Sequence, residues 1–143
     1  HNGLSFEKSF ETIKKSYPDY RIISIFGVPG DRAKSRLRDM STIAAKNSDM
    51  VMIVPDDPGS RPFKQIAQDM IDYIKKYNQR YEVHSARVHA IEHIFETNNE
   101  KTLLFIAGKG SDKHDNVGGK IVVIEDDVSI VTRLVKSYDY RNN

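Results

Sequence analysis

The sequence predicts an open α/β fold, in which a Rossmann-like, mostly parallel sheet of about five to six strands carries helices on both faces. Short, continuously apolar runs rich in β-branched residues indicate strands that are buried on both faces. Between them lie longer segments whose apolar residues recur at helical spacing. No internal repeat, low-complexity tract or linker interrupts the alternation, so we expect residues 1–143 to form a single domain.

The first half of the chain alternates between helix and strand. A helical stripe that includes Phe6 and Phe10 stops before Pro18, because a proline disfavours helical geometry in the residue before it. Gly27 and Pro55 each end an apolar run that has the composition of a buried strand. We therefore expect helices over 4–16, 33–46 and 63–77, and strands over 21–26 and 50–54.

The second half continues the same alternation. Tyr81 to Val83 is a short strand candidate, and a helix that carries Val88, Ile91 and Phe95 follows it. The apolar runs 102–107 and 120–124 predict two more buried strands. Asp126 or Asp127 is expected to cap a last helix, because a carboxylate at that position accepts hydrogen bonds from free backbone amides.

Composition excludes several classes of protein. The chain has no cysteine, which excludes a disulfide scaffold, a thiolate zinc site and a cysteine nucleophile. Its 22 basic and 20 acidic residues are interspersed and leave a net charge of +2, so a nucleic-acid partner is not expected. No apolar run approaches the roughly 20 residues that span a bilayer, so a membrane partner is not expected either.

Polar loops follow three of the predicted strands directly. They are GVPGDR at 27–32, PDDPGS at 55–60 and GKGSDKHDN at 108–116. In open parallel sheets, ligands bind at the carboxyl ends of the strands, where such loops meet. The sequence therefore predicts one binding site that all three loops form together.

The loop at 27–32 combines flexible backbone with charge. Gly27 and Gly30 permit tight turns, Asp31 is able to cap the next helix or accept from ribose hydroxyls, and Arg32 offers a planar fork for a carboxylate or phosphate. A plain strand-to-helix turn is the alternative interpretation of these residues. Neither a P-loop nor a GxGxxG motif occurs in the chain.

The other candidate groups are individually weaker. Asp56 and Asp57 form a turn that is also able to hold an ammonium group or a metal-bound water. The glycines around Lys109 let backbone amides approach a ligand, and Lys109 or Asp112 is able to supply charge. His89 and His93 have the spacing of a metal-binding pair, but no third ligand is nearby, so we expect two partly solvated side chains and no metal site.

Taken in order, these motifs resemble the C-terminal domain of the Mur ligases, in the UDP-N-acetylmuramoyl-tripeptide synthetase branch. The family motifs are the end of DYAH-N/T, then GDR, a DNPR or DNPA turn, DRxxAI and GKGxE. They match His1-Asn2, Gly30-Asp31-Arg32, Asp56-Asp57-Pro58-Gly59, Arg87-Val88-His89-Ala90-Ile91 and Gly108-Lys109-Gly110-Ser111-Asp112.

The resemblance implies a cytoplasmic ligase that extends UDP-MurNAc-L-Ala-D-Glu with an amino acid during peptidoglycan synthesis. ATP phosphorylates the substrate carboxylate, and the amine of the incoming amino acid attacks the acyl phosphate. ATP and Mg²⁺ are expected to bind mainly in a central ATPase domain. That domain and an N-terminal UDP-binding domain would be further parts of the protein, outside this chain, which is expected to be inactive alone.

The resemblance also implies roles for individual residues. On the nucleotide side the matching positions are His1, Asn2 and Asp31. The positions that bind the incoming amino acid match Arg32, Asp56, Asp57, Pro58, Gly59, Gly108 and Asp112. No catalytic residue and no metal ligand is expected within the chain.

Three departures from the family pattern bear on specificity. Gly59 stands where, by the resemblance, diaminopimelate-adding enzymes carry an arginine for the second carboxylate of that substrate, which favours L-lysine or another diamino acid with one carboxylate over meso-diaminopimelate. Arg61, two residues on, leaves diaminopimelate open as the alternative. Asp112 replaces a glutamate, and Ala86 replaces the aspartate of DRxxAI. Two alternatives stay open: a related ligase of the folylpolyglutamate or cyanophycin synthetase type, and a non-catalytic Rossmann-like nucleotide-binding module.

Overall fold

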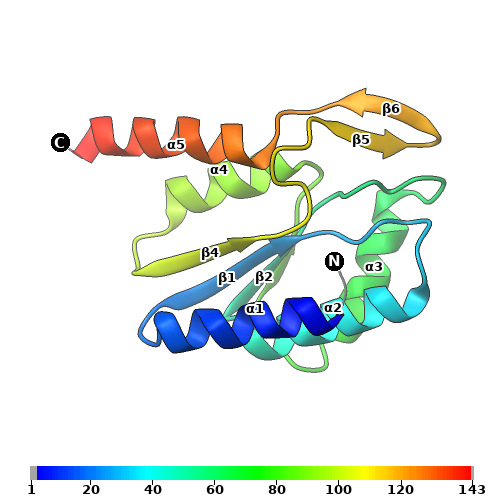
Figure 1. Cartoon of the computed structure of the whole chain (residues 1–143), viewed down its shortest axis with the longest axis horizontal. Coiled ribbons are helices and arrows are strands. Elements are labelled where there is room, and N and C mark those ends of the chain that lie inside the picture. Colours follow the sequence, from blue (N-terminus) through cyan, green and yellow to red (C-terminus); the bar gives the residue numbers. More distant parts are fainter. Residues whose placement is uncertain (1–2, 143) are drawn as a thin grey trace.

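The computed structural model of the chain describes the backbone of residues 3–142 and the side chains of residues 3–139. Four parallel strands form one sheet in the order β3-β2-β1-β4 (Figure 1). Their bounds are β1 Arg21–Phe26, β2 Met50–Ile53, β3 Tyr81–Val83 and β4 Thr102–Ile106. His1 and Asn2, two of the residues predicted on the nucleotide side, lie outside the described residues.

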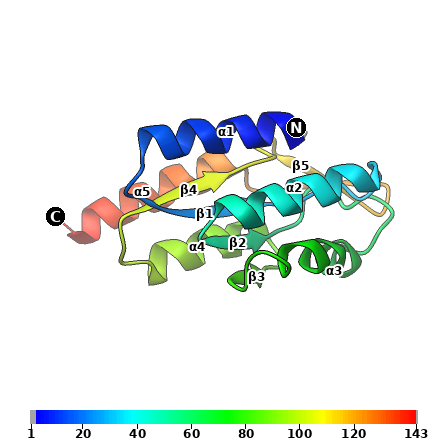
Figure 2. The ribbon, with the colours of Figure 1, turned by 90° about the horizontal axis from the view of Figure 1, so that it is seen from below.

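Five helices cover the two faces of this sheet (Figure 2). On one face, Phe6 and Phe10 pack with the buried side chains of two further helices and with Phe26 of β1. On the other face, Ile91 and Ile130 pack against Ile23 and Ile25 of β1 and other strand residues. The first layer contains α1 (Gly3–Ser16), α2 (Lys34–Asn47) and α3 (Phe63–Ile74), and the second contains α4 (Arg87–Thr97) and α5 (Asp127–Asn142). The predicted α/β class with helices on both faces is confirmed.

The predicted strand at 120–124 forms, but it does not belong to the parallel sheet. Lys120–Val123 (β6) pairs antiparallel with His114–Val117 (β5) in a separate two-stranded hairpin. The turn between them is Gly118-Gly119, and both glycines have positive φ, 60° and 80°. A two-residue turn of this kind joins only antiparallel neighbours. The parallel sheet therefore has four strands among the described residues, not about five to six.

The apolar residues of the hairpin do not enter the core. Ile121 is 70% exposed and Val123 is 77% exposed, whereas Asp115 of β5 is buried. The hairpin is thus attached to the rest of the molecule mainly through polar groups, and the apolar run of β6 is not a buried strand.

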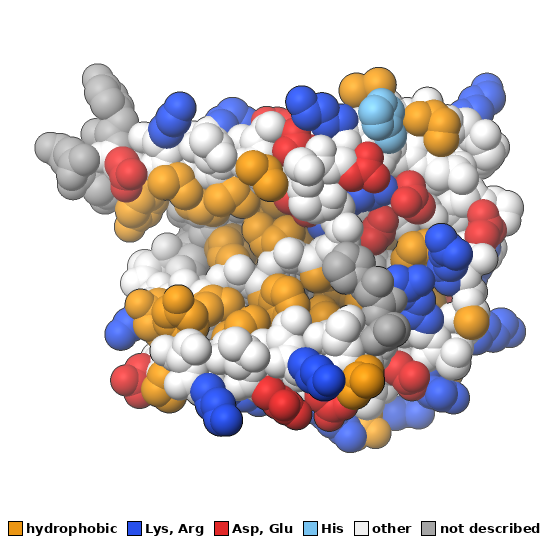
Figure 3. Space-filling view, in the orientation of Figure 1, with side chains coloured by type: hydrophobic (Ala, Val, Ile, Leu, Met, Phe, Trp, Pro, Cys, Tyr) orange, Lys and Arg blue, Asp and Glu red, His pale blue; other side chains and the backbone are white. Residues whose placement is uncertain are grey.

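The edge strand β4 is only half-buried along its length. A recess with hydrophobic walls lies between α5 and the sheet in the space-filling view (Figure 3). Leu104 of β4, Ile94 and Phe95 of α4, and Tyr138 of α5 line a cavity of about 370 Å³ there. β4 has no strand partner on its outer side among residues 3–142.

The last helix has the predicted cap. The backbone amide and the hydroxyl of Ser129 both donate to the Asp126 carboxylate, at 3.1 and 2.6 Å. Asp31 does not cap α2, which is one of the two roles that the sequence allowed for it. Ala33 occupies the N-cap position, and the helix has no side-chain cap. No helix among the described residues has the length and apolar character needed to cross a membrane.

Candidate functional site

The loops that follow β1, β2 and β4 meet at one edge of the sheet, as the sequence predicts. The loop 55–60 after β2 lies between the other two parts of the site. Gly30 donates its backbone amide to the Asp57 carbonyl on one side, and Gly59 donates to the Asn116 carbonyl of β5 on the other. The loop that we call the selection loop, residues 55–60, is therefore the centre of the arrangement.

Lys109 is the buried cation at the centre of this group of carboxylates. Its side chain is 2% exposed, and its ammonium group lies 2.9 Å from Asp57 Oδ1 and 3.0 Å from Asp115 Oδ1. It also donates to the carbonyl oxygen of His114 at 2.9 Å. Asp56 and Asp112 lie farther away, at 3.5 and 3.8 Å. One buried ammonium thus lies close to four carboxylates, two from the selection loop and two from the segment 112–115.

The pKa values of this cluster reflect burial and pairing. Burial alone lowers the pKa of Lys109, but its hydrogen bonds to Asp57 and Asp115 outweigh burial and raise that pKa. Burial raises the pKa of Asp56 in spite of the nearby charges of Arg87 and Lys109. Burial also acts against ionisation of Asp57, but hydrogen bonds from Lys109 and the Asn116 amide lower its pKa.

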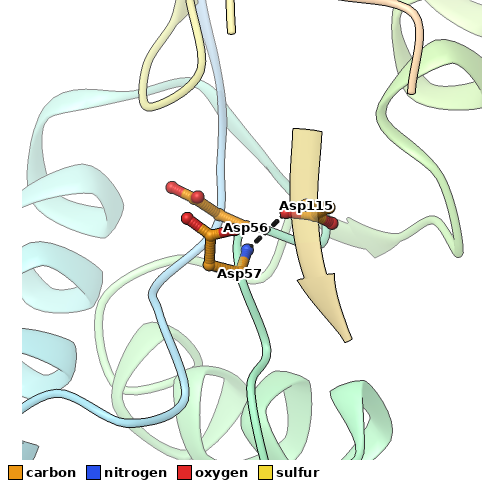
Figure 4. Close-up of side chains that lie close together, drawn as sticks. All are labelled: Asp56, Asp57 and Asp115. Carbon is orange, nitrogen blue, oxygen red and sulfur yellow. Dashed lines mark hydrogen bonds between the residues drawn. The ribbon is translucent and has the colours of Figure 1, made fainter. Parts of the chain in front are cut away.

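Backbone and carboxylate groups join β5 to the selection loop (Figure 4). The Asp57 amide donates to Asp115 Oδ1 at 2.6 Å, and the Asn116 amide donates in return to Asp57 Oδ1 at 2.8 Å. Gly118 donates to the Gly59 carbonyl at 2.7 Å. Each carboxylate therefore fixes the backbone of the other segment as well as pairing with Lys109.

Arg87, at the start of α4, is a second buried cation behind the site. It forms a two-point ion pair with Asp127 at 2.9 and 2.6 Å, and it donates to the Ala107 carbonyl at 2.8 Å and the Pro55 carbonyl at 3.3 Å. These bonds join the ends of β2 and β4 to the first turn of α5. Arg87 thus holds the loops that carry Asp56 and Lys109 in place.

Position 59 has no room for a side chain, because Asp31 lies beside it. Its φ is +66°, and a Cβ atom added there would overlap the Asp31 carboxylate, 2.6 Å from Cγ. That carboxylate accepts from the Ser60 hydroxyl at 2.6 Å and from the Ser60 amide at 3.3 Å. Asp31 therefore fills the space that a side chain at position 59 would need.

A cavity of about 460 Å³ opens beside the selection loop. Four of the predicted site residues, Asp31, Arg32, Asp57 and Asp112, line it. The remaining lining residues are Pro29, His114, Asp115, Asn116 and Ile121. Arg32 is exposed and makes no hydrogen bond or ion pair with any residue in the described part of the chain. Its guanidinium is thus available to a ligand.

The other predicted residues support this cavity without lining it. Asp56 and Gly108 lie behind it, and a Cβ atom at Gly108 would lie 2.7 Å from Asp56 Oδ2. Gly59 is buried, and Pro58 faces a second, more apolar cavity of about 370 Å³ together with Arg87. The sequence predicts no role for Asp115, and it predicts for Lys109, between two glycines after β4, only that it supplies charge to its loop.

The carboxylates of Asp56, Asp57 and Asp115 approach one another closely enough to hold a cation. Oxygen donors of this kind suit Mg²⁺ or Ca²⁺. The ammonium of Lys109 already lies among them and hydrogen-bonds two of the three. His93 Nε2 lies 3.6 Å from a Glu82 carboxylate oxygen, and His84 Nε2 lies 2.9 Å from the same oxygen.

Comparison with known proteins gives the family. The family model described as "Mur ligase, glutamate ligase domain" matches residues 1–110. The chain belongs to the Mur ligase family. The solved structure of a UDP-N-acetylmuramoyl-L-alanyl-D-glutamate–2,6-diaminopimelate ligase superposes with a TM-score of 0.80 at 22% identity, and it covers 100% of this chain and 28% of that structure. A folylpolyglutamate synthase from Thermotoga maritima is less similar, with a TM-score of 0.56 at 18% identity over 76% of this chain and 23% of that one.

Curated Mur ligases include three informative relatives. The UDP-N-acetylmuramyl-tripeptide synthetase of Ligilactobacillus salivarius is 29% identical over 95% of this chain and 27% of its own length. The 2,6-diaminopimelate ligase of Alkaliphilus oremlandii is 32% identical over 88% of the chain and 26% of its own. The L-lysine ligase of Enterococcus faecalis is 30% identical over 83% of the chain and 23% of its own.

These matches confirm the resemblance to the muramyl-tripeptide branch and the fold. The chain spans between 23% and 27% of the length of these three Mur ligases. Relatives named for diaminopimelate and for L-lysine occur side by side at similar identity, so the identity of the added amino acid does not follow from likeness alone.

Proposed function

We propose that this chain is the C-terminal domain of an ATP-dependent ligase that adds an amino acid to UDP-MurNAc-L-Ala-D-Glu in peptidoglycan precursor synthesis. The family match and the names of the relatives support this reaction. Residues 1–143 act as one domain, and the UDP-binding and ATPase domains are other parts of the protein. The enzyme works in the cytoplasm, where its nucleotide substrates are made.

In this proposal the described residues bind and orient the incoming amino acid. Arg32, free of internal partners at the cavity rim, holds the α-carboxylate with its planar fork. Asp31, which lines the same cavity, binds the nucleotide in this proposal, as do His1 and Asn2, whose placement is not described. ATP with Mg²⁺, bound mainly by the central domain, supplies the phosphoryl group that activates the acceptor carboxylate.

The added amino acid in this proposal is L-lysine in preference to meso-diaminopimelate. The observation that carries this choice is the charge of the cavity, whose lining has four carboxylates and one guanidinium. Lys109 offsets part of the negative charge but leaves an excess. A terminal ammonium group is attracted to such a surface, whereas the extra carboxylate of diaminopimelate is repelled.

The selection loop supports the same preference. A second carboxylate on the substrate needs a cationic partner, and Gly59 offers none. The Asp31 carboxylate occupies the adjoining space, so the position holds negative charge where diaminopimelate-adding enzymes are expected to hold positive charge. Arg61, two residues on, is committed to an ion pair with Asp69 at 2.7 Å.

An amino-acid panel tests the proposal. The full-length protein is incubated with ATP, Mg²⁺ and UDP-MurNAc-L-Ala-D-Glu, and with L-lysine, L-ornithine or meso-diaminopimelate in turn; products are identified by mass spectrometry. We expect a tripeptide product, with kcat/KM highest for L-lysine. A higher value for diaminopimelate overturns the substrate choice but not the reaction.

A parallel arm with a reduced folate and L-glutamate tests the folylpolyglutamate alternative. Product in that arm alone would replace the proposed reaction with the folate reaction. Absence of product in every arm would favour a non-catalytic nucleotide-binding role. The 143-residue chain on its own is expected to form no product, and ligation by it would refute its assignment as one domain of a larger ligase.

A further inference from the structure

We propose that Lys109 is a positioning residue for the amino-acid cavity, in that its buried ammonium holds the β5–β6 hairpin against the selection loop. The consequence for kinetics rests on the function proposed above, whereas the consequence for structure does not. Lys109 lies behind the cavity wall and contacts no substrate in this proposal. It acts through Asp57 and Asp115.

The β5–β6 hairpin is attached to the rest of the molecule almost entirely through polar groups. All four residues of β6 are exposed, and in β5 only Asp115 is buried. The hairpin therefore has almost no apolar anchor in the core. Its place is fixed instead by the bonds between Asp57, Asp115, Asn116, Gly59 and Gly118.

The carboxylates that make those bonds lie close to one another. Asp56, Asp57 and Asp115 bring oxygens within 4.8 Å of one another, and Asp115 has a side chain that is only 8% exposed. Three ionised carboxylates at this separation repel one another unless a cation lies among them. Lys109 is the cation that meets this need for Asp57 and Asp115, with one hydrogen bond to each carboxylate and a third to the His114 carbonyl. The charge of Arg87 also lies near Asp56.

The hairpin also forms one wall of the cavity. Its lining includes His114, Asp115, Asn116 and Ile121 of the hairpin, together with Asp31 and Arg32 of the loop after β1. Movement of the hairpin would widen the cavity by removing this wall. Removal of the Lys109 charge should thus weaken amino-acid binding without altering the groups proposed to face ATP.

Amide hydrogen exchange on the 143-residue chain tests the structural part. Lys109→Met keeps the length of the side chain and removes its charge; Lys113→Met is the matched control, because Lys113 is exposed on the same segment. We expect the amides of Asp57, Asn116 and Gly118 to lose protection by about 10-fold or more in Lys109→Met, while β1 and β2 keep theirs. Unchanged protection at these amides, or equal loss in the control, overturns the proposal.

Lys109→Arg and Asp115→Asn keep the test decisive if Lys109→Met fails to fold. Arginine retains the charge, so it should restore protection at the three amides. The neutral amide introduced by Asp115→Asn cannot pair with the ammonium as a carboxylate does, so the same amides should exchange faster while the core remains protected. Equal loss of protection in hairpin and core would show a general role in stability and refute a positioning role.

Steady-state kinetics on the full-length enzyme test the functional part. Lys109→Met should raise the KM for the amino acid by about 10- to 100-fold, with a small change in kcat and in the KM for ATP. A fall in kcat at unchanged KM refutes the positioning role. If the unmodified enzyme ligates no amino acid, the proposed function fails, and the exchange experiment still decides whether Lys109 positions the hairpin.

Discussion

Replacement of Gly59 by alanine tests whether Asp31 excludes a side chain from the selection loop. Gly118 is a matched control, because its φ is +60° against +66° at Gly59 and because a Cβ atom there would meet nothing within 4 Å. Both glycines take part in the same backbone bond, from the Gly118 amide to the Gly59 carbonyl. The two substitutions thus carry similar backbone strain and differ in the contact with Asp31.

The surroundings of each glycine determine how much each substitution should lower the free energy of unfolding. A left-handed conformation costs an alanine about 1–2 kcal/mol, which is the whole cost expected for Gly118→Ala. Gly59→Ala must also displace the Asp31 carboxylate from the Ser60 amide and hydroxyl, which adds about 1–2 kcal/mol at this exposed site. The total for Gly59→Ala is about 2–4 kcal/mol, which corresponds to a fall in Tm of about 7–13 °C in a chain of this length.

Chemical denaturation of the single and double variants measures the Asp31 contribution directly. In an Asp31→Ala background, Gly59→Ala should cost no more than Gly118→Ala does, because the overlapping carboxylate is gone. If Gly59→Ala costs the same with and without Asp31, the steric argument is refuted. The same reasoning predicts that Gly59→Arg shifts the ratio of kcat/KM toward diaminopimelate in the full-length enzyme, at a cost in stability; an unchanged ratio would place selectivity elsewhere.

Other predictions concern charged groups around the site. Arg32→Ala should raise the KM for the amino acid by about 10- to 100-fold and leave the KM for ATP unchanged; equal effects on both substrates would contradict its proposed role. Arg87→Met leaves Asp127 buried and unpaired, so it should lower the free energy of unfolding by about 3–5 kcal/mol, and Asp127→Leu in the same chain should restore most of the loss. The pKa of Asp57 is lowered in the folded state, so its contribution to stability is present above its ordinary pKa of 3.8 and is lost as the pH falls below that value. Asp57→Asn should therefore flatten the stability profile on the acid side, in urea unfolding measured from about pH 6 down to about pH 3, and a profile parallel to that of the unchanged chain would refute this linkage.

Local patterns in the sequence predicted most elements well, because a strand that is buried on both faces appears in the sequence as a continuous apolar run. The runs at 21–26 and 50–54 and the stripe of α3 coincide with β1, β2 and a helix to within a few residues. The prediction of a buried strand at 120–124 was wrong, although the composition of this run resembles that of a buried strand. The turn at Gly118-Gly119 instead pairs it with β5 in an exposed hairpin. β5 itself has the polar sequence His-Asp-Asn-Val, which gives no periodic signal.

The sequence predicted which loops form the site, but it did not predict the buried ion pairs behind the cavity. The rule that parallel strands bring their carboxyl ends to one edge was sufficient to gather the three loops, and Asp31, Arg32, Asp57 and Asp112 do line one cavity. The ion pairs of Lys109 with Asp115 and of Arg87 with Asp127 join residues that lie 6 and 40 positions apart. Which of many charges pair in this way depends on tertiary packing, and no spacing in the sequence records it.

The outer edge of β4 has a consequence for the behaviour of this chain in solution. Residues 102–106, Thr-Leu-Leu-Phe-Ile, contain none of the charges or prolines with which natural sheets usually discourage pairing at an edge. Their outward amides and carbonyls are a template for a strand from another molecule. At high concentration we therefore expect self-association of the 143-residue chain to begin along β4, and Leu103→Lys would be the first substitution to improve its solubility.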